Sequence, residues 1–221
     1  MKNKKGELTS KQLITIIILI VSFTIIVAFF VMLGLKSIIS DESCRNSVMM
    51  KSIPFGDWVF VLKCKTEDIC FSMGGECGVK TDKTIEVENK DELIKETVNL
   101  LAECWWRMGE GKVKYGGNGD CAICYKVYFD EEAKKINPNW INIASYISTA
   151  KMPNRDITYG GYLYSGEETK LIEGETILFT DIEYAVVTGI YDGKYIPPYF
   201  IKFSASELRS KLGCSSYVTE V

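Results

Sequence analysis

The sequence predicts an α+β fold, in which one N-terminal transmembrane helix is followed by a compact, disulfide-stabilised α+β domain. Three observations lead to this prediction. A long apolar run occupies residues 13–35, all eight cysteines follow it, and the rest of the chain alternates between strand-like and helix-like patterns. With 221 residues, 47% of them hydrophobic, the chain can form one well-cored domain.

The apolar run reads "LITIIILIVSFTIIVAFFVMLGL" and contains no charged residue. At about 1.5 Å per residue, a helix over this run would match the roughly 30 Å hydrocarbon core of a bilayer, whereas a cleavable signal peptide has a shorter apolar region of about 7 to 15 residues. No A-x-A cleavage pattern follows the run. The pattern therefore predicts an uncleaved anchor.

The flanking charges predict the orientation of this anchor. Only Glu7 opposes the lysines that precede the run, which are Lys2, Lys4, Lys5 and Lys11. Under the positive-inside rule, residues 1–12 would be a basic cytoplasmic segment and everything after the run would lie outside. We therefore expect a short linker at 36–43, an extracytoplasmic cysteine-rich domain at 44–221, and a single-pass location in the cell membrane.

The first elements of the outer domain are two strands and a helix. Alternating apolar residues in "DWVFVLKCK", residues 57–65, predict a strand that buries Cys64, and "KTIEV", residues 83–87, predicts a second. Asn89, followed three residues later by a glutamate, predicts the cap of a helix that ends at Gly109. This helix has the clearest apolar stripe of the domain.

Later elements follow from similar signals. Alternation in 121–130 predicts a strand, and Asn137 with Pro138 predicts the start of a helix. The stretch 182–203 predicts a hairpin turning at Asp192 and Gly193, whose return strand is confined by two prolines to a sheet edge or a bulge. A capping box, Ser204 with Glu207, predicts a last short helix ending at Gly213.

The even number of cysteines predicts disulfides, because the predicted compartment is oxidising. Cys104 is the favoured partner for one member of the Cys121–Cys124 pair, since the strong helix and the strand after the glycine-rich loop are natural neighbours, and Cys214 could staple the tail. All eight are candidates: Cys44, Cys64, Cys70, Cys77, Cys104, Cys121, Cys124 and Cys214.

The Cys-x-x-Cys pair itself allows three interpretations: a redox centre, half of a zinc site, or halves of two separate disulfides. A thioredoxin-like pair needs a helix after its first cysteine, but "YKVYFD" follows with strand periodicity. In a strand, Cys121 and Cys124 would point to opposite faces. Separate disulfides are favoured over the redox and zinc alternatives.

Composition restricts the chemistry and the partners. The chain has no histidine, which excludes Ser–His–Asp and Cys–His nucleophilic sites. No phosphate-binding glycine loop occurs, and we expect no cofactor, no metal and no catalytic residue unless Cys121 and Cys124 form a redox pair. After Lys36 the chain has 21 basic and 28 acidic residues, and this net charge of −7 argues against nucleic acid as a partner. The expected partners are the membrane and an unknown protein or envelope component.

Neighbouring tryptophans on a helix face different directions, because successive residues are about 100° apart. Trp105 continues the apolar stripe and is expected in the core. Trp106 is either covered by the following glycine loop or exposed as an anchor for a partner. A possible interaction surface therefore consists of Trp106, Arg107 and Glu110.

Several segments carry a resemblance to known proteins. "CRNSV" at 44–48, "LKCKT" at 62–66, "AECWWRMGEGKV" at 102–113 and "CAICYKVYFD" at 121–130 resemble a group of uncharacterised single-pass membrane proteins of archaea. The resemblance covers roughly the first 130 residues and implies an anchor and a cysteine-rich outer domain, but no activity.

The N-terminus, "KKGELTSKQLITIII", is similar to the leader of archaeal type IV prepilins, which would be cut after Gly6. The chain departs from that pattern at Glu7 and Lys11, and it lacks the acidic residue expected five positions into the mature start.

From these patterns we expect a cell-surface or envelope binding or structural module rather than an enzyme. Two alternatives remain open: a thiol–disulfide oxidoreductase that uses Cys121 and Cys124, and a type IV pilin-like subunit.

Overall fold

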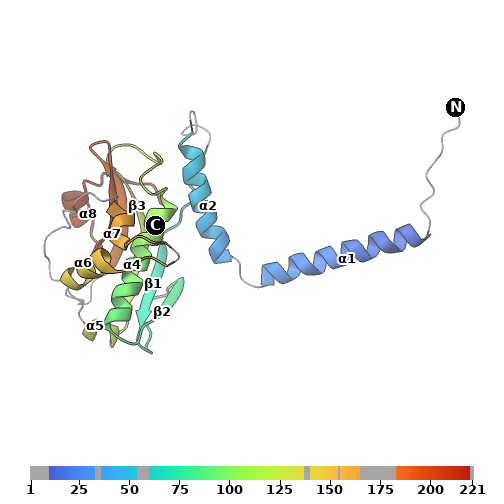
Figure 1. The fold of residues 1–221 in the computed structure, drawn as a ribbon, viewed down its shortest axis with the longest axis horizontal. Coiled ribbons are helices and arrows are strands. Elements are labelled where there is room, and N and C mark those ends of the chain that lie inside the picture. Colours follow the sequence, from blue (N-terminus) through green and yellow to red (C-terminus); the bar gives the residue numbers. More distant parts are fainter. Residues whose placement is uncertain are drawn as a thin grey trace. The chain divides into compact units, whose positions relative to one another are not determined.

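The computed structural model describes residues 10–32, 36–53, 60–136, 140–153, 155–164 and 183–219 (Figure 1). It divides into two compact units, residues 1–41 and 42–221. The first contains helix α1 (Ser10–Met32), and helix α2 (Lys36–Lys51) crosses the boundary between the units. The second unit mixes a β-sheet with helices, as the sequence predicts.

The N-terminal part of the chain requires a correction. α1 spans Ser10–Met32, and residues 33–35 at the end of the apolar run lie outside the described residues. Within the ranges given above, no helix combines the length and the apolar character needed to cross a bilayer. The prediction of a transmembrane helix, and with it that of a single-pass membrane location with a cytoplasmic segment 1–12, is therefore wrong. The predicted linker 36–43 is helical, as part of α2.

Among its described residues, the second unit is built on a six-stranded sheet with the order β2-β1-β3-β4-β5, and β6 also pairs with β3. β3 is parallel to β1 and antiparallel to β4, while β1 and β2 are parallel. β1 and β6 both lie along the same edge of β3. They do not collide, because β6 pairs with the first two residues of β3 and β1 pairs with its second half. The strands are β1 (Glu67–Ser72), β2 (Lys83–Glu86), β3 (Asp120–Phe129), β4 (Tyr184–Tyr191), β5 (Lys194–Lys202) and β6 (Ser216–Tyr217).

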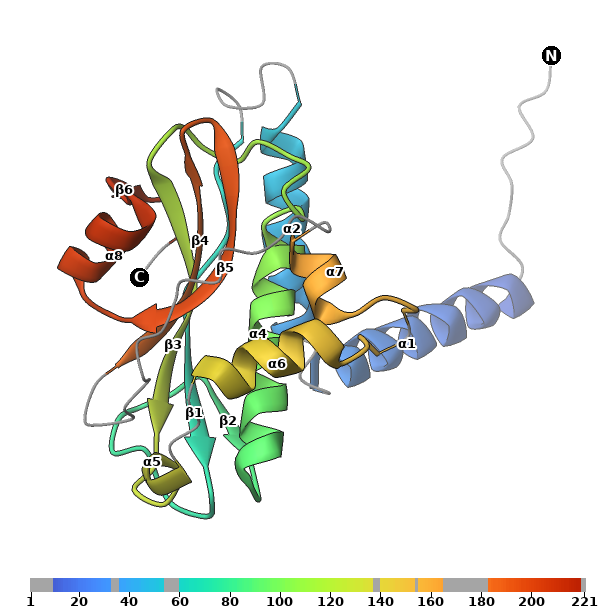
Figure 2. The same cartoon turned by 60° about the vertical axis from the view of Figure 1, so that its left-hand side comes forward.

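Helices cover both faces of this sheet (Figure 2). α4 (Lys90–Arg107) packs on one face together with α6 (Trp140–Thr149) and α7 (Tyr159–Tyr164), and the larger hydrophobic core lies between these helices and the sheet. α8 (Ala205–Leu212) packs against β5 on the other face, over a smaller core. The short helix α5 (Ala133–Ile136) follows β3.

Most local signals in the sequence are confirmed. Asn89 caps α4, since its side chain accepts from the Glu92 amide at 3.0 Å. Ser204 caps α8 in the same way, accepting from the Glu207 amide at 3.2 Å, and Gly213 ends that helix in the left-handed conformation. The predicted hairpin is present as β4 and β5.

The prolines of the return strand also lie as predicted. β5 is an edge strand, and its register against β4 shifts between Val187 and Gly189, which adds one residue to β5 beside Pro197 and Pro198. Proline has no amide hydrogen to donate to a ladder, so an edge strand with a bulge accommodates it.

The first predicted strand, 57–65, differs from the structure. Residues 60–64 belong to no named strand, and Trp58 lies outside the described residues. The predicted alternation of buried and exposed side chains is nevertheless present, because Leu62 and Cys64 are buried while Val61 is 81% exposed. Residues 60–64 therefore alternate in burial without belonging to a strand.

Four disulfides use all eight cysteines: Cys44–Cys64, Cys70–Cys77, Cys104–Cys124 and Cys121–Cys214. The predicted pairing of Cys104 with one member of the Cys-x-x-Cys motif is confirmed, and so is the staple of the tail through Cys214. The chain is thus cross-linked on both faces of β3.

Candidate functional site

Cys121 and Cys124 do not form a redox pair in this structure, because each is bonded to a different partner. They lie on opposite faces of β3: Cys121 belongs to the core under α8, and Cys124 to the core under α4. A β-bulge makes Cys124 the extra residue between Ile123 and Tyr125. Both cysteines are at most 2% exposed, so the motif is a pair of structural cross-links.

The described residues do not indicate a metal site. Across the ranges that the structure describes, no group of three or more Cys, Asp or Glu side chains could hold a metal ion. Asp130 is only 1% exposed, and its oxygens accept hydrogen bonds from the loop after β1 and from the first turn of α5. It organises loops and does not face solvent.

A different group of side chains gathers where α4 ends. α4 leads into the turn Gly109–Glu110–Gly111, whose three residues all have positive φ, of 82°, 57° and 66°. Glycine suits this conformation, and an added Cβ at Gly111 would lie 2.8 Å from the Trp105 ring. The turn aims the Glu110 carboxylate back toward the helix end, while the Glu110 amide donates to the Trp105 carbonyl at 2.8 Å.

Three cations surround this carboxylate. Lys112 Nζ is 2.8 Å from Glu110 Oε2, Arg155 Nη2 is 3.8 Å from Oε1, and Arg45 Nη2 is 4.0 Å from Oε2. The Tyr162 hydroxyl also donates to Oε1, at 3.0 Å. Three positive charges against one negative charge leave a local surplus of positive charge.

Two of these cations are stacked on aromatic rings. The Arg45 guanidinium carbon lies 4.6 Å from the centroid of the Trp106 ring, and that of Arg155 lies 4.8 Å from the Tyr162 ring. Arg45 also donates to the Trp106 carbonyl. We call these six residues the Glu110 cluster: Arg45, Trp106, Glu110, Lys112, Arg155 and Tyr162.

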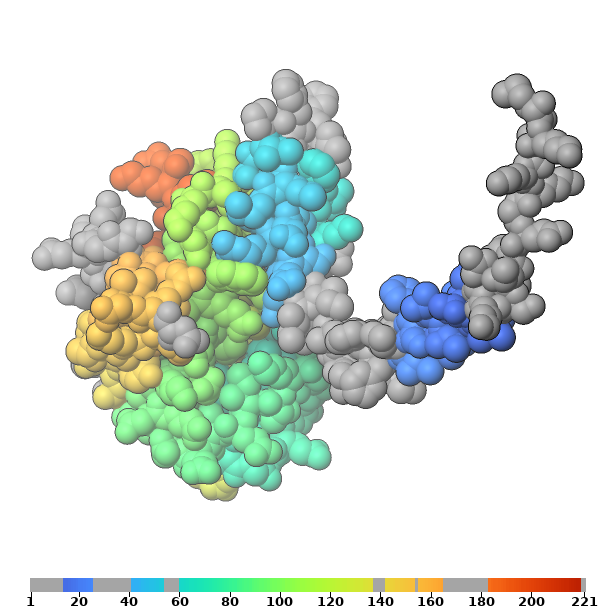
Figure 3. All heavy atoms as spheres, turned by 45° about the vertical axis from the view of Figure 1, so that its right-hand side comes forward, coloured from blue at the N-terminus to red at the C-terminus, as the bar shows by residue number. Residues whose placement is uncertain are grey.

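The Glu110 cluster has a buried centre and an accessible rim. The side chain of Glu110 is only 10% exposed, whereas those of Arg45, Arg155 and Lys112 are 24%, 45% and 75% exposed. In Figure 3 the segments that carry Arg45, the turn residues and Tyr162 border one another on one face: α2 in light blue, the turn after α4 in yellow-green and α7 in orange. The cations therefore line a surface above a fixed carboxylate.

The ionisation of Glu110 follows from these contacts. Partial burial raises the pKa of the Glu110 carboxyl, but the hydrogen bonds from Lys112 and Tyr162 and the positive charges of Lys112 and Arg45 outweigh burial. The net effect is a pKa below the ordinary value. Burial and the Glu110 charge raise the pKa of the Tyr162 hydroxyl, so it stays protonated as a donor.

Of the interaction surface predicted from the sequence, two of the three residues lie together in the structure. Trp106 and Glu110 belong to the cluster, but the Arg107 side chain is only 4% exposed. Arg107 pairs with the Glu67 carboxylate and stacks over the Tyr125 ring, 4.9 Å from its centroid. It belongs to the core, because a rotation of about 100° along α4 turns it away from Trp106. Trp105 is buried as predicted, at 5% exposure.

Sequence reasoning missed Arg45, Lys112, Arg155 and Tyr162. Three of them come from segments distant along the chain, and no local pattern links these segments to the turn after α4. Arg45 follows Cys44, whose disulfide to Cys64 fixes α2 to the segment before β1. The adjacent cysteine was therefore the only sequence feature near Arg45 that indicated a fixed position.

No family model, no curated protein and no solved structure matches the chain. The likeness to archaeal membrane proteins and to prepilin leaders therefore stays a prediction, and Gly6 and Glu7, on which the prepilin reading depends, lie outside the described residues.

Proposed function

We propose that the protein is a disulfide-stapled binding module that recognises an acidic segment of a protein partner through the Glu110 cluster. The observation that carries the proposal is the pair of partly exposed arginines, each stacked on an aromatic ring, beside one buried carboxylate. Four disulfides favour work in an oxidising compartment.

Stacking prepares these arginines for binding. A ring under the guanidinium plane leaves the edges of that plane available to donate, and a guanidinium edge matches a carboxylate in a two-pronged geometry. Because the rings and Glu110 already restrain Arg45 and Arg155, less side-chain entropy is lost when a partner docks.

The composition of the cluster also fits a protein interface. Tryptophan, tyrosine and arginine are the residues that most often dominate binding energy at such interfaces. The excess of positive charge selects an acidic partner, although the chain as a whole carries a net charge of −3. The Glu110 carboxylate holds the cations apart and in place.

A peptide-binding measurement tests the proposal. The probe is a fluorescent twelve-residue peptide of alternating Glu and Tyr, and the matched probe replaces each Glu by Gln. We expect the acidic peptide to bind and the Gln peptide to bind at least ten times more weakly, with fluorescence anisotropy as the readout. Binding of the acidic peptide should weaken as salt is raised, because exposed charges are screened.

Variants locate the site. Arg45→Ala and Arg155→Ala should each weaken binding about tenfold, which corresponds to about 1.4 kcal/mol. Arg209→Ala removes the same charge from an exposed position on α8 and serves as the matched control, with unchanged affinity expected. Equal binding of both peptides, or equal effects of all three substitutions, would contradict the proposal.

A further inference from the structure

Of the eight cysteines, Cys77 alone is not buried. The other seven are each at most 4% exposed, whereas Cys77 is half-buried on the loop between β1 and β2. Its partner Cys70 lies inside β1, between residues that face the core under α4. Cys70 therefore points to the opposite face of the sheet. The described helix on that side, α8, packs against β5, at the far edge of the sheet from β2.

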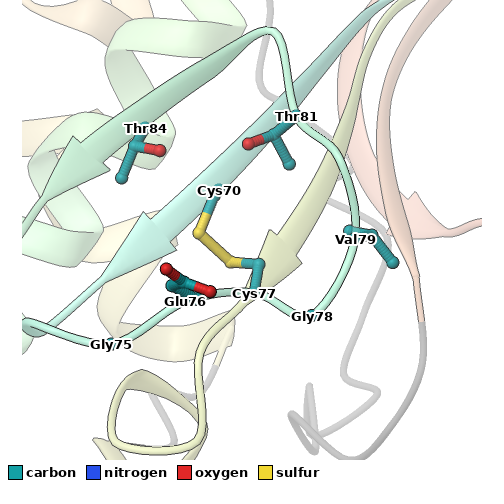
Figure 4. A pocket seen from close by; sticks show the side chains of 8 residues that line it. All are labelled: Cys70, Gly75, Glu76, Cys77, Gly78, Val79, Thr81 and Thr84. Carbon is teal, nitrogen blue, oxygen red and sulfur yellow. A yellow bond between two sulfur atoms is a disulfide. The ribbon is translucent and has the colours of Figure 1, made fainter.

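A pocket opens at this disulfide. It has a volume of about 360 Å³ and is lined by both cysteines, by Thr84 of β2 and by the loop residues Gly75, Glu76, Gly78, Val79 and Thr81. Figure 4 shows the disulfide crossing the pocket, with the Glu76 carboxylate near Cys77 and the Thr81 and Thr84 hydroxyls directed inward on the side of Cys70.

Hydrogen bonds hold the loop at both ends without the disulfide. At its start, Asp130 Oδ2 accepts from the Met73 amide at 2.8 Å and from the Gly75 amide at 2.9 Å. At its end, Asp82 Oδ2 accepts from the Asp68 amide at 3.1 Å, and the Asp82 amide donates to the Asp68 carbonyl at 2.8 Å. The loop is therefore expected to keep its place when the sulfur–sulfur bond opens.

We propose that the Cys70–Cys77 disulfide is a thiol-exchange site that accepts two electrons from a dithiol, distinct from the Glu110 cluster. A thiolate of the dithiol attacks Cys77 Sγ, forms a mixed disulfide there and breaks the bond to Cys70. Cys70 leaves as a thiolate and takes up a proton. The second thiol of the dithiol loses its proton and attacks the dithiol sulfur that is bonded to Cys77. This closes the disulfide of the oxidised dithiol and releases Cys77, which takes up a proton and becomes a thiol.

The products balance: the dithiol is oxidised to a disulfide, and Cys70 and Cys77 are reduced to two thiols. Attack at Cys77 is favoured because exchange requires access to the sulfur, and Cys70 is only 2% exposed. Thr81 and Thr84 carry hydroxyls that can donate to the departing thiolate. The Glu76 charge disfavours thiols that carry a further negative charge besides that of the attacking thiolate.

The order of reduction tests the site on the folded full chain. The protein is treated with dithiothreitol at neutral pH for increasing times, quenched with iodoacetamide and digested for peptide mapping. We expect Cys70 and Cys77 to be labelled at least ten times faster than the other six cysteines, with an unchanged circular dichroism spectrum. Labelling of another pair first, or of all pairs together with loss of the spectrum, would overturn the proposal.

Single-cysteine variants identify the sulfur that is attacked. Cys70→Ser leaves Cys77 as a thiol, and Cys77→Ser leaves Cys70 as a thiol. With dithiodipyridine, a neutral disulfide, as the probe, Cys77 in the first variant should react at least ten times faster than Cys70 in the second. Comparable rates, or a faster Cys70, would exclude Cys77 as the point of attack.

A charge variant tests the role of the pocket. Glu76→Gln should speed attack by mercaptoethanesulfonate, whose attacking thiolate carries two negative charges, several-fold more than attack by mercaptoethanol, whose thiolate carries one. Asp156→Asn removes an exposed carboxylate outside the pocket lining and should change neither rate. An equal effect of Glu76→Gln on both thiols would show that the pocket charge does not select the donor.

Discussion

At the scale of single residues, Asp130 shows how one carboxylate can organise two segments. Its Oδ2 accepts from the Ser72 hydroxyl at 3.1 Å as well as from the two loop amides, and its Oδ1 accepts from the Ala133 amide at 2.7 Å, at the start of α5. The side chain is only 1% exposed. Buried charge is tolerated here because several donors surround it.

Replacing this carboxylate tests the arrangement. Asp130→Asn keeps one acceptor oxygen but turns an amide donor toward a backbone N–H, so we expect the free energy of unfolding at pH 7 to fall by about 2 kcal/mol. Urea unfolding followed by circular dichroism measures the loss. Asp156→Asn, at a side chain that is 93% exposed, is the control and should change stability by less than about 0.5 kcal/mol.

The same residue gives a pH dependence of known sign. Burial raises the pKa of the Asp130 carboxyl, but hydrogen bonds from Ala133, Met73, Gly75 and Ser72 outweigh it, so the folded-state pKa lies below the ordinary value of 3.8. A group with a lowered pKa stabilises the fold fully above its unfolded-state pKa and loses that contribution as pH falls through the folded value. The difference between wild type and Asp130→Asn should therefore shrink in urea titrations below pH 3.8; a constant difference would refute this account.

At the scale of elements, local sequence signals were sufficient to predict a helix or a hairpin wherever a capping residue or a turn residue fixes the backbone at its end. α4, the β4–β5 hairpin and α8 have such signals at their ends, and the structure confirms all three. The segment 60–64 has strand periodicity without a partner strand, and alternation alone cannot supply one. Nothing local indicated α7, a six-residue helix with two glycines.

The cap of α4 offers a prediction at this scale. Asn89→Ala removes the acceptor for the Glu92 amide, and the stability of the domain should fall by about 1 kcal/mol, because that donor is then left to water. Lys95→Ala, on the same helix at a side chain that is 51% exposed, is the matched control. Thermal unfolding of both variants measures the difference, and equal melting temperatures would argue against a capping role.

At the scale of the whole molecule, the sequence was least informative, because the decisive contacts join distant segments. The Glu110 cluster brings α2, the turn after α4, Arg155 and α7 together. The parallel pairs β2–β1 and β1–β3 likewise depend on long connections rather than on turns. The apolar run 13–35 also predicted a membrane span, whereas no described helix has the length and apolar character to cross a bilayer.

Cysteine connectivity is a whole-molecule property with measurable consequences. The bond Cys121–Cys214 spans 93 positions of the chain, whereas Cys70–Cys77 spans 7. Loop entropy scales with the logarithm of the loop length, so the long bond should contribute about 4.7 kcal/mol to stability and the short one about 2.5 kcal/mol. The long bond also holds the tail that pairs with β3 through β6.

Removing each bond as a pair of alanines tests this ranking. The double variant Cys121→Ala with Cys214→Ala should lose about 2 kcal/mol more of its free energy of unfolding than Cys70→Ala with Cys77→Ala, as measured by urea unfolding. It should also expose Ser216 and Tyr217 amides to hydrogen exchange, because Cys214 no longer ties the tail to β3. Equal losses would mean that native packing, rather than restriction of the unfolded chain, sets the contribution of these bonds. The smaller loss expected for the short bond is also what allows Cys70 and Cys77 to be reduced while the fold persists.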